Sequence, residues 1–127
     1  MKGIVITPQC EVTVRDFEKP LYKSTAEVTG GFEIVKPIGL PSPFCMIVDD
    51  NGLLKNDIEI NPIGSFFYGT NVHGHPIVGT IVIMKMGYTL EGADIVGLSD
   101  GDIDRITYQI EDIKSRIQPQ EAPHDLS

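Results

Sequence analysis

The sequence predicts an α+β fold, a single small domain in which a mixed or mainly antiparallel sheet of about five or six strands packs with two or three helices. Three observations lead to this prediction. The length of 127 residues is typical of one compact domain. Apolar residues form 41% of the chain and charged residues 22%, which is enough apolar surface for a folded core. Short strand-like segments alternate with segments that carry helix start and stop signals.

The first third of the chain is expected to form three strands and one helix. The segments "KGIVIT" and "EVTVRDF" have the composition of strands, and "PQC" between them predicts a tight connection. The segment "PLYKSTAEVTGG" predicts a helix near residues 20–29, because Pro20 is a favourable start and the Gly30-Gly31 pair is a favourable end. In "FEIVKPI", Pro37 marks the end of a strand or its position at a sheet edge.

An apolar run followed by Asp49-Asp50-Asn51-Gly52 gives the clearest local signal. Asn-Gly at the centre of a turn favours the type I′ hairpin, because both residues tolerate positive φ angles. The two acidic residues also suggest calcium binding, but the twelve-residue calcium loop that ends in glutamate is missing. We therefore predict a structural turn at this position and no metal site.

The segment "NPIGSFFYG" predicts a short helix near residues 61–68. Asn61 is a good N-cap, Pro62 is a good first residue, and Gly69 is a good stop. The buried stripe of this helix is expected to be Ile63, Phe66 and Phe67. The following segment, residues 75–87, is the most apolar of the chain and predicts a central strand covered on both faces. A last short strand is expected in "ADIVGL".

The last expected element is a helix near residues 100–117, where Ser99 and Asp102 resemble a capping box. Isoleucines recur along it at spacings of three and four residues, namely Ile103, Ile106, Ile110, Ile113 and Ile117. We expect this stripe to pack on the domain's own sheet, and the alternative is the seam of a homodimer. The domain is thus placed at residues 1–117. Residues 118–127 hold two prolines and little to bury, so a flexible tail is expected there.

Acidity is concentrated in the C-terminal third of the chain. The net charge is −8, and residues 91–127 hold nine acidic side chains against three basic ones. Such a molecule is repelled by phosphates, so direct binding to nucleic acid or to an anionic membrane is not expected. An acidic face that includes Asp100, Asp102 and Asp104 is instead suited to a basic protein surface, including one that normally binds DNA. The alternative is that the charge serves only solubility.

Cysteine usage and hydropathy predict a cytoplasmic protein. Cys10 and Cys45 are too few for a disulfide framework and lie among apolar neighbours, so buried thiols without a catalytic role are expected. No apolar run reaches the roughly 20 residues that a membrane-spanning helix needs. The apolar stretch at the start of the chain is too short for a secretory signal.

The segment "YGTNVHGHPIVG", residues 68–79, is the candidate functional site. Metal binding is disfavoured, because alternate residues of an extended chain point to opposite sides and two histidines do not complete a ligand set. No nucleophile motif and no phosphate-binding motif is present, so neither a catalytic residue nor a cofactor is predicted. A loop with hydroxyl groups, amides and imidazoles is nevertheless suited to a small ligand. The candidate ligand-binding residues are Tyr68, Gly69, Thr70, His73 and His75.

A structural interpretation of the same segment competes with this one, and we favour it. Gly69, Gly74 and Gly79 permit positive φ angles and a close approach of the backbone. Pro76 rigidifies the entrance to the following strand. His73 is expected to hold the loop through a hydrogen bond between its side chain and the backbone. The segment is then first of all a strand entrance.

Residues 1–106 also resemble a family of small uncharacterised domains common in phages, prophages and plasmids of Firmicutes. The resemblance lies in "MKGIVITP", "GGFEIV", "IVDDNGLLKN", "DIVGLSDGDIDRI" and above all "NPIGSFFYGTNVHGHPIVGTIVI". In this last segment the residues that match the family pattern are Asn61, Ser65, Tyr68, Gly69, Thr70, His73, Gly74, Pro76, Ile77, Val78 and Gly79. His75 falls at a variable position of the pattern, which weakens a metal site made of two histidines. The resemblance implies no activity.

Two classes of function follow from the sequence. The first is a non-enzymatic accessory protein of a phage or mobile element, which acts in the bacterial cytoplasm by binding a host protein. In one version its acidic face inhibits a host-defence or DNA-handling protein. The second class is small-molecule binding or, less favoured, catalysis at the Tyr68–Gly79 loop. This second class requires a concave pocket beside the loop.

Overall fold

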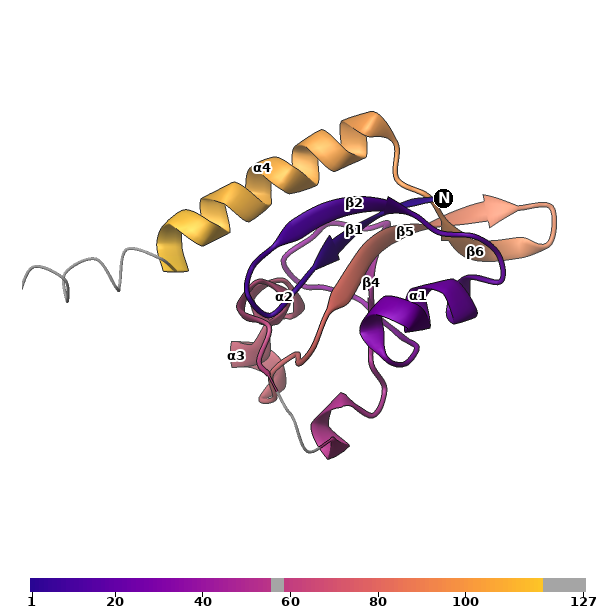
Figure 1. The fold of residues 1–127 in the computed structure, drawn as a ribbon. Coiled ribbons are helices and arrows are strands. Elements are labelled where there is room, and N and C mark those ends of the chain that lie inside the picture. The colour runs from indigo at the N-terminus through magenta and orange to yellow at the C-terminus, as the bar shows by residue number, and fades with distance from the viewer. Residues whose placement is uncertain (56–58, 118–127) are drawn as a thin grey trace, which may run out of the picture.

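The computed structural model describes residues 1–55 and 59–117 (Figure 1), and the expected tail at 118–127 lies outside the described residues. The described part contains one six-stranded sheet. Its strands are β1 (Lys2–Ile6), β2 (Val12–Asp16), β3 (Glu33–Val35), β4 (Phe44–Val48), β5 (Ile81–Thr89) and β6 (Gly92–Val96). The helical elements are α1 (Leu21–Thr29), the 3₁₀ turn η1 (Gly52–Leu54), α2 (Pro62–Tyr68), α3 (Thr70–His73) and α4 (Asp100–Ile117).

The sheet is antiparallel throughout its described strand pairs. Its strand order is β2-β1-β5-β4-β3, and β1 and β6 lie one after the other along the same side of β5. The predicted α+β class is confirmed. The helices expected near residues 20–29, 61–68 and 100–117 correspond to α1, α2 and α4, whereas the single helical turn α3 was not expected.

Helices cover both faces of the sheet (Figure 1). On one face, α2 and α4 pack over Ile81 and Ile83 of β5. On the other face, α1 packs over Val82 and Met84 of the same strand. All four side chains are fully buried, because alternate residues of a strand point to opposite faces. This confirms the predicted central strand with two covered faces, although the strand begins at Ile81 and not at residue 75.

The helix ends follow the local signals of the sequence. Helix α1 begins after Pro20 and ends at Gly30, whose φ is 90°. Helix α2 is capped by the side chain of Asn61 and ends at Gly69, whose φ is 89°. One side-chain prediction in α2 is wrong, because Phe66 is 48% exposed while its two expected partners in the stripe are buried. Its ring lies on the outer side of the helix.

The isoleucine stripe of α4 packs on the domain's own sheet. Ile106, Ile110 and Ile113 are buried in the same core as α2, and Ile103 and Ile117 lie partly buried against it. This is the arrangement that was expected over a dimer seam. The central isoleucines of the stripe are therefore buried within the domain itself. A homodimer that forms through the stripe remains an untested alternative.

The predicted type I′ hairpin after β4 is wrong. Asn51 has a φ of −113°, and Gly52 opens η1 instead of turning the chain back along β4. Gly52 is buried, and a Cβ atom there would lie 2.6 Å from Val78 Cγ2. Asp49 forms an ion pair with Lys55 and accepts a hydrogen bond from the Asn51 backbone N–H at 2.9 Å. The expected structural turn is present, but close packing against the loop decides its shape.

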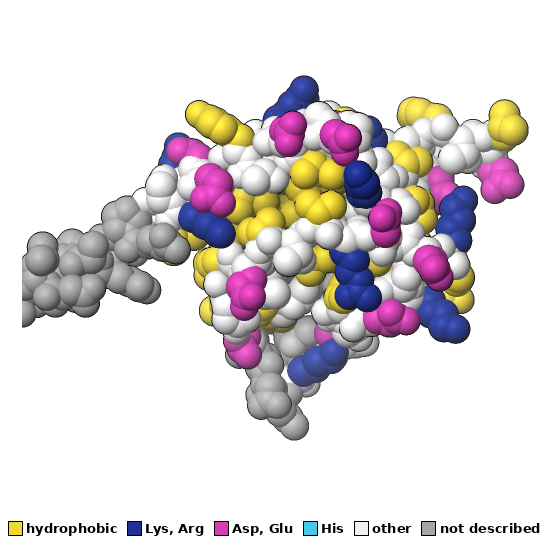
Figure 2. Space-filling view, turned by 45° about the horizontal axis from the view of Figure 1, so that its top comes forward, with side chains coloured by type: hydrophobic (Ala, Val, Ile, Leu, Met, Phe, Trp, Pro, Cys, Tyr) yellow, Lys and Arg dark blue, Asp and Glu magenta, His cyan; other side chains and the backbone are white. Residues whose placement is uncertain are grey.

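The surface carries charges of both signs. Figure 2 looks onto the side of the molecule that bears α4, and acidic and basic side chains are interspersed there around one exposed apolar area. Within the described residues, no helix combines the length and apolar character needed to cross a bilayer.

Candidate functional site

The loop between α2 and β5 is held by the side chain of Asn61, which is fully buried. Its Oδ1 accepts a hydrogen bond from the Gly64 backbone N–H at 2.9 Å, which caps α2. Its Nδ2 donates to the carbonyl oxygens of Ile6 at 3.0 Å and Gly79 at 2.8 Å. One side chain thus joins the start of α2, the end of β1 and the entrance to β5.

A second anchor for the loop is Ser65, on the following turn of α2. Its hydroxyl accepts a hydrogen bond from the Ile77 backbone N–H at 3.0 Å and donates to the Ile77 carbonyl at 3.3 Å. Gly69, Gly74 and Gly79 have φ angles of 89°, 89° and 77°, as predicted. Asn61, Ser65 and these glycines therefore serve the structure of the strand entrance.

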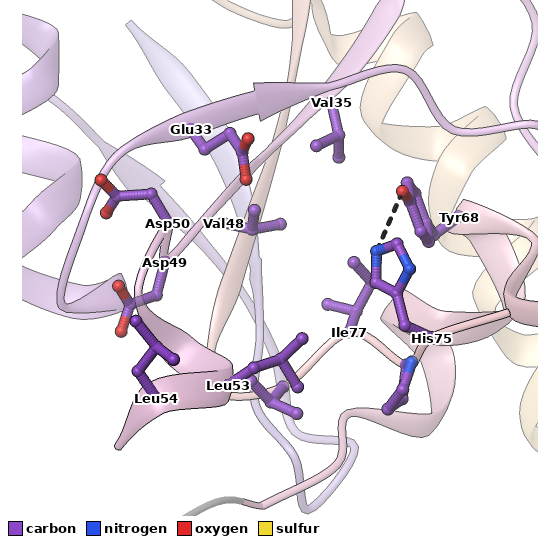
Figure 3. Close-up of a pocket in the computed structure, with 12 residues that line it drawn as sticks. Glu33, Val35, Val48, Asp49, Asp50, Leu53, Leu54, Tyr68, His75 and Ile77 are labelled. Atoms are coloured by element: carbon purple, nitrogen blue, oxygen red, sulfur yellow. Dashed lines mark hydrogen bonds between the residues drawn. The ribbon is translucent and has the colours of Figure 1, made fainter. Parts of the chain in front are cut away.

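The aromatic side chains of the loop form a compact group around Tyr68. The ring of His73 stacks on that of Tyr68, with 4.3 Å between ring centroids and 22° between planes. The hydroxyl of Tyr68 lies 3.3 Å from His75 Nε2, at hydrogen-bonding distance (Figure 3). The predicted hydrogen bond from the His73 side chain to the backbone is not found among the described residues, and stacking takes its place. The turn of α3 brings both histidines to one tyrosine.

A pocket of about 320 Å³ opens beside this group. Tyr68 and His75 form one wall, and residues of β3, β4 and η1 form the other (Figure 3). Its apolar lining includes Val35, Val48, Leu53, Leu54, Ile77 and Val78. The lining carboxylates come from Glu33, Asp49 and Asp50. An apolar interior with a few polar groups at the walls is the usual composition of a small-molecule site.

The three carboxylates of the pocket differ in their surroundings. The Asp49 side chain is only 5% exposed and is paired with Lys55. Asp50 accepts a hydrogen bond from the Phe32 backbone N–H at 3.3 Å. Glu33 is exposed, and in Figure 3 its carboxylate extends over the pocket towards the wall formed by Tyr68 and His75. Glu33 is therefore the acid best placed to meet a ligand.

The other predicted ligand-binding residues lie outside this pocket. His73 stacks behind Tyr68, and Gly69 lies against the side chain of Ile38, where a Cβ atom would come within 2.8 Å of Ile38 Cδ1. Thr70 lines a separate depression with Ser65 and neighbouring residues of α2 and α3. Of the five residues predicted from the sequence, Tyr68 and His75 are the two that line the pocket of about 320 Å³.

The predicted acidic residues of α4 have different roles. Asp102 and Ser99 form the expected capping box, in which Asp102 Oδ2 accepts from the Ser99 backbone N–H at 2.9 Å and Ser99 Oγ accepts from the Asp102 backbone N–H at 3.1 Å. Asp102 also pairs with Lys85 at 2.6 Å. Asp100 is exposed and lies 3.2 Å from Lys2 Nζ, and Asp104 is exposed. Two of the three carboxylates thus point to solvent.

Within residues 1–55 and 59–117, two titratable groups have clearly shifted pKa values, and both shifts have structural causes. The hydrogen bond from Lys85, followed by that from the Ser99 backbone, lowers the pKa of Asp102 to about 2. Burial raises the pKa of the Cys45 thiol to about 11, against a smaller opposing hydrogen bond with the Met84 backbone. Cys45 is thus a protonated core thiol, as expected. In residues 1–55 and 59–117, no group of three or more His, Cys, Asp or Glu side chains is arranged to hold a metal ion.

Comparison with known families assigns the chain to one of them. The model of the family described as Domain of unknown function (DUF3846) matches residues 1–111. The chain belongs to this family. No curated protein and no solved structure matches it. The DUF3846 description names no activity, so the site itself has to supply the chemical argument.

The sequence did not reveal the far wall of the pocket in this DUF3846 member. Glu33 belongs to a segment with strand-like alternation, and that segment carries no signal of a ligand site. Its proximity to Tyr68 and His75 depends on the order of the strands, in which β3 follows β4 at the sheet edge. Strand order is a property of the whole fold, and local patterns leave it open.

Proposed function

We propose that the protein is a non-enzymatic binding module whose ligand site is the pocket beside Tyr68 and His75. The observation that supports this proposal is the pocket itself, because small-ligand binding at the loop requires a concavity and these two side chains line one. Its volume of about 320 Å³ is at the lower end of the range for small-molecule sites. The site therefore suits a small organic ligand or a short chemical group.

The chemistry of the lining favours binding over catalysis. The described residues that line the pocket include no serine, cysteine or lysine, and of the other groups that can act as nucleophiles, Asp49, Asp50, Tyr68 and His75 are each engaged in an ion pair or hydrogen bond. The Cys45 thiol is buried and protonated. Tyr68 and His75 are hydrogen-bonded to each other, and the Tyr68 hydroxyl and the His75 imidazole can form further hydrogen bonds at one end of an apolar surface. Such a wall orients a ligand.

The test is native mass spectrometry of the protein expressed in a bacterial host, compared with two tyrosine variants. Tyr68→Phe removes the hydroxyl that bonds to His75, and Tyr108→Phe makes the same change on an exposed tyrosine of α4. We expect a retained small molecule in the wild type and in Tyr108→Phe, and its loss or weaker retention in Tyr68→Phe. A clean apo mass for the wild type, together with no binding from a small-molecule library, would overturn the proposal.

A second candidate function is supported by the exposed acids of α4. Asp100 and Asp104 lie on the surface at the start of this helix. The sequence resembles domains of phages and other mobile elements, so the partner in this proposal is a basic surface of a bacterial host protein, in the cytoplasm. Asp102 is excluded from this surface, because it caps α4 and pairs with Lys85.

This second proposal is tested by charge reversal. The double variant Asp100→Lys, Asp104→Lys is compared with Glu27→Lys, which changes an exposed acid on α1. We expect the double variant to lose a host protein that the wild type and Glu27→Lys both capture, and the captured protein to dissociate as salt is raised. Equal capture by all three proteins would contradict a role for these two carboxylates.

A further inference from the structure

We infer that the pocket takes a cationic group, an aliphatic amine or a guanidinium, for which Glu33 supplies the counter-charge. The inference rests on the proposed function and adds the chemical class of the ligand. It is carried by the distribution of charge around the apolar lining, and by the direction in which the Glu33 carboxylate extends in Figure 3.

The charges of the lining oppose an anionic ligand. Three carboxylates line the pocket, and no lysine or arginine does so among the described residues. Lys55 offsets Asp49 from outside the lining. The Asp50 carboxylate points away from the cavity and accepts a hydrogen bond from the Phe32 backbone N–H. Glu33 is thus the negative charge that faces the pocket, where it repels an anion placed between the walls and attracts a cation.

The geometry gives a cationic group two kinds of partner. An ammonium or guanidinium group beside Glu33 forms a charge-assisted hydrogen bond, which is shorter and stronger than a neutral one. On the opposite wall, the Tyr68 hydroxyl has two acceptor lone pairs and one proton, so its bond with His75 leaves at least one lone pair for an N–H donor.

The apolar lining suits the rest of such a ligand. Val35, Val48 and Ile77 separate the acidic rim from the wall formed by Tyr68 and His75. Methylene groups of an amine or guanidine cover apolar surface of this kind while the charged end stays at the rim. A bare calcium ion does not fit the same surroundings, since it requires six to eight oxygen ligands, and here Asp49 is already paired with Lys55 while Asp50 is bonded to the Phe32 backbone N–H.

The test uses three probes that share a four-carbon chain and differ in charge: butylamine, 1-butanol and butyrate. Binding is followed through the backbone amide resonances of residues 33–35, His75, Ile77 and Val78 at about 20 mM and about 200 mM salt. We expect butylamine to bind most tightly and to bind more weakly at the higher salt concentration. Glu33→Gln is expected to raise the dissociation constant of butylamine by about fivefold, which is the upper range for the loss of a solvent-exposed ion pair. Glu27→Gln, an exposed acid of α1, leaves binding unchanged.

A charge-swapped variant separates the failure of this inference from that of the proposed function. Glu33 is exposed, so Glu33→Lys leaves the core intact and is expected to favour butyrate over butylamine. If 1-butanol or butyrate binds the wild type as well as butylamine, or if Glu33→Gln has no effect, the cationic class is wrong while the ligand site stands. If no probe shifts any resonance of the pocket, this inference is overturned, and the proposed function falls with it when the wild type also shows a clean apo mass and binds no compound of the library.

Discussion

Asn61 shows at the scale of one residue how the strand entrance is built. Asn61→Ala leaves the Gly64 N–H and the carbonyls of Ile6 and Gly79 without their partner, in a fully buried position. Loss of an N-cap together with buried hydrogen bonds is expected to lower the free energy of unfolding by about 2–4 kcal/mol. Urea denaturation measures the change.

The matched control for this prediction is Asn71→Ala. Asn71 is exposed in α3, so its replacement is expected to change the free energy of unfolding by less than about 0.5 kcal/mol. Equal destabilisation by the two variants would mean that the hydrogen bonds of Asn61 do not hold the loop.

The same residue marks the limit of what the sequence predicts. The cap on α2 was predictable, because its partner Gly64 lies three residues away. The bonds to Ile6 and Gly79 join residues 55 and 18 positions apart, and no local pattern indicates them. His75 is a similar case. It falls at a variable position of the family pattern, and its bond to Tyr68 depends on the helical turn of α3.

At the scale of elements, the start of α4 depends on the charge of Asp102. Its pKa is lowered from 3.8 to about 2 in the folded protein, so this carboxylate stabilises the fold above about pH 4, and the stabilisation is lost as the pH falls towards 2. Because the side chain is 17% exposed, solvent screening reduces the effect, and Asp102→Asn is expected to cost about 1 kcal/mol at pH 7.

Urea denaturation between pH 2 and pH 7 tests this expectation. The difference between the wild type and Asp102→Asn should shrink to a small fraction of its value at pH 7 by pH 2, where about half of the Asp102 carboxylate is protonated in the folded protein. Asp104→Asn is the control, since it replaces an exposed carboxylate two residues further along the same helix. A constant difference across the pH range would show that Asp102 acts through its cap geometry and not through its charge.

The packing of α4 makes a second prediction at this scale. Ile110→Ala removes a fully buried side chain from the core shared with α2, and the cavity is expected to lower the free energy of unfolding by about 2–5 kcal/mol. Tyr108→Ala, on the exposed side of α4, should stay within about 0.5 kcal/mol of the wild type. Unfolding of both proteins should not depend on protein concentration, whereas a dimer seam through the stripe would make it do so.

Elements were predictable wherever their signals are local. Helices α1, α2 and α4 have their caps and stops within one turn of their ends, and these signals were sufficient. The Asn51-Gly52 hairpin failed because a contact outside the local sequence decides the conformation of Gly52, which packs against Val78. Tertiary contact overrode the turn propensity at this position.

On the scale of the whole molecule, the sheet order both creates the pocket and determines where the fold is most stable. Strand β3 at the edge brings Glu33 to the loop, and β5 in the centre is covered on both faces. Stability is not uniform in such a fold, because the last parts to open are those with the most buried contacts and with paired backbone on both sides. These conditions meet in the first half of β5.

Amide hydrogen exchange followed by mass spectrometry tests this distribution. Residues Ile81–Met84 are fully buried, and β1 and β4 flank them, so peptides that cover them should exchange most slowly, near the rate set by global unfolding. The tip of the β5–β6 hairpin, where Tyr88 is 92% exposed, should exchange within the earliest time points.

Asn61→Ala is expected to accelerate exchange at residues 75–80 more than in β4, because the loop loses its anchor while the strand keeps both neighbours. Uniform acceleration across the sheet would instead show that loop and sheet open as one unit.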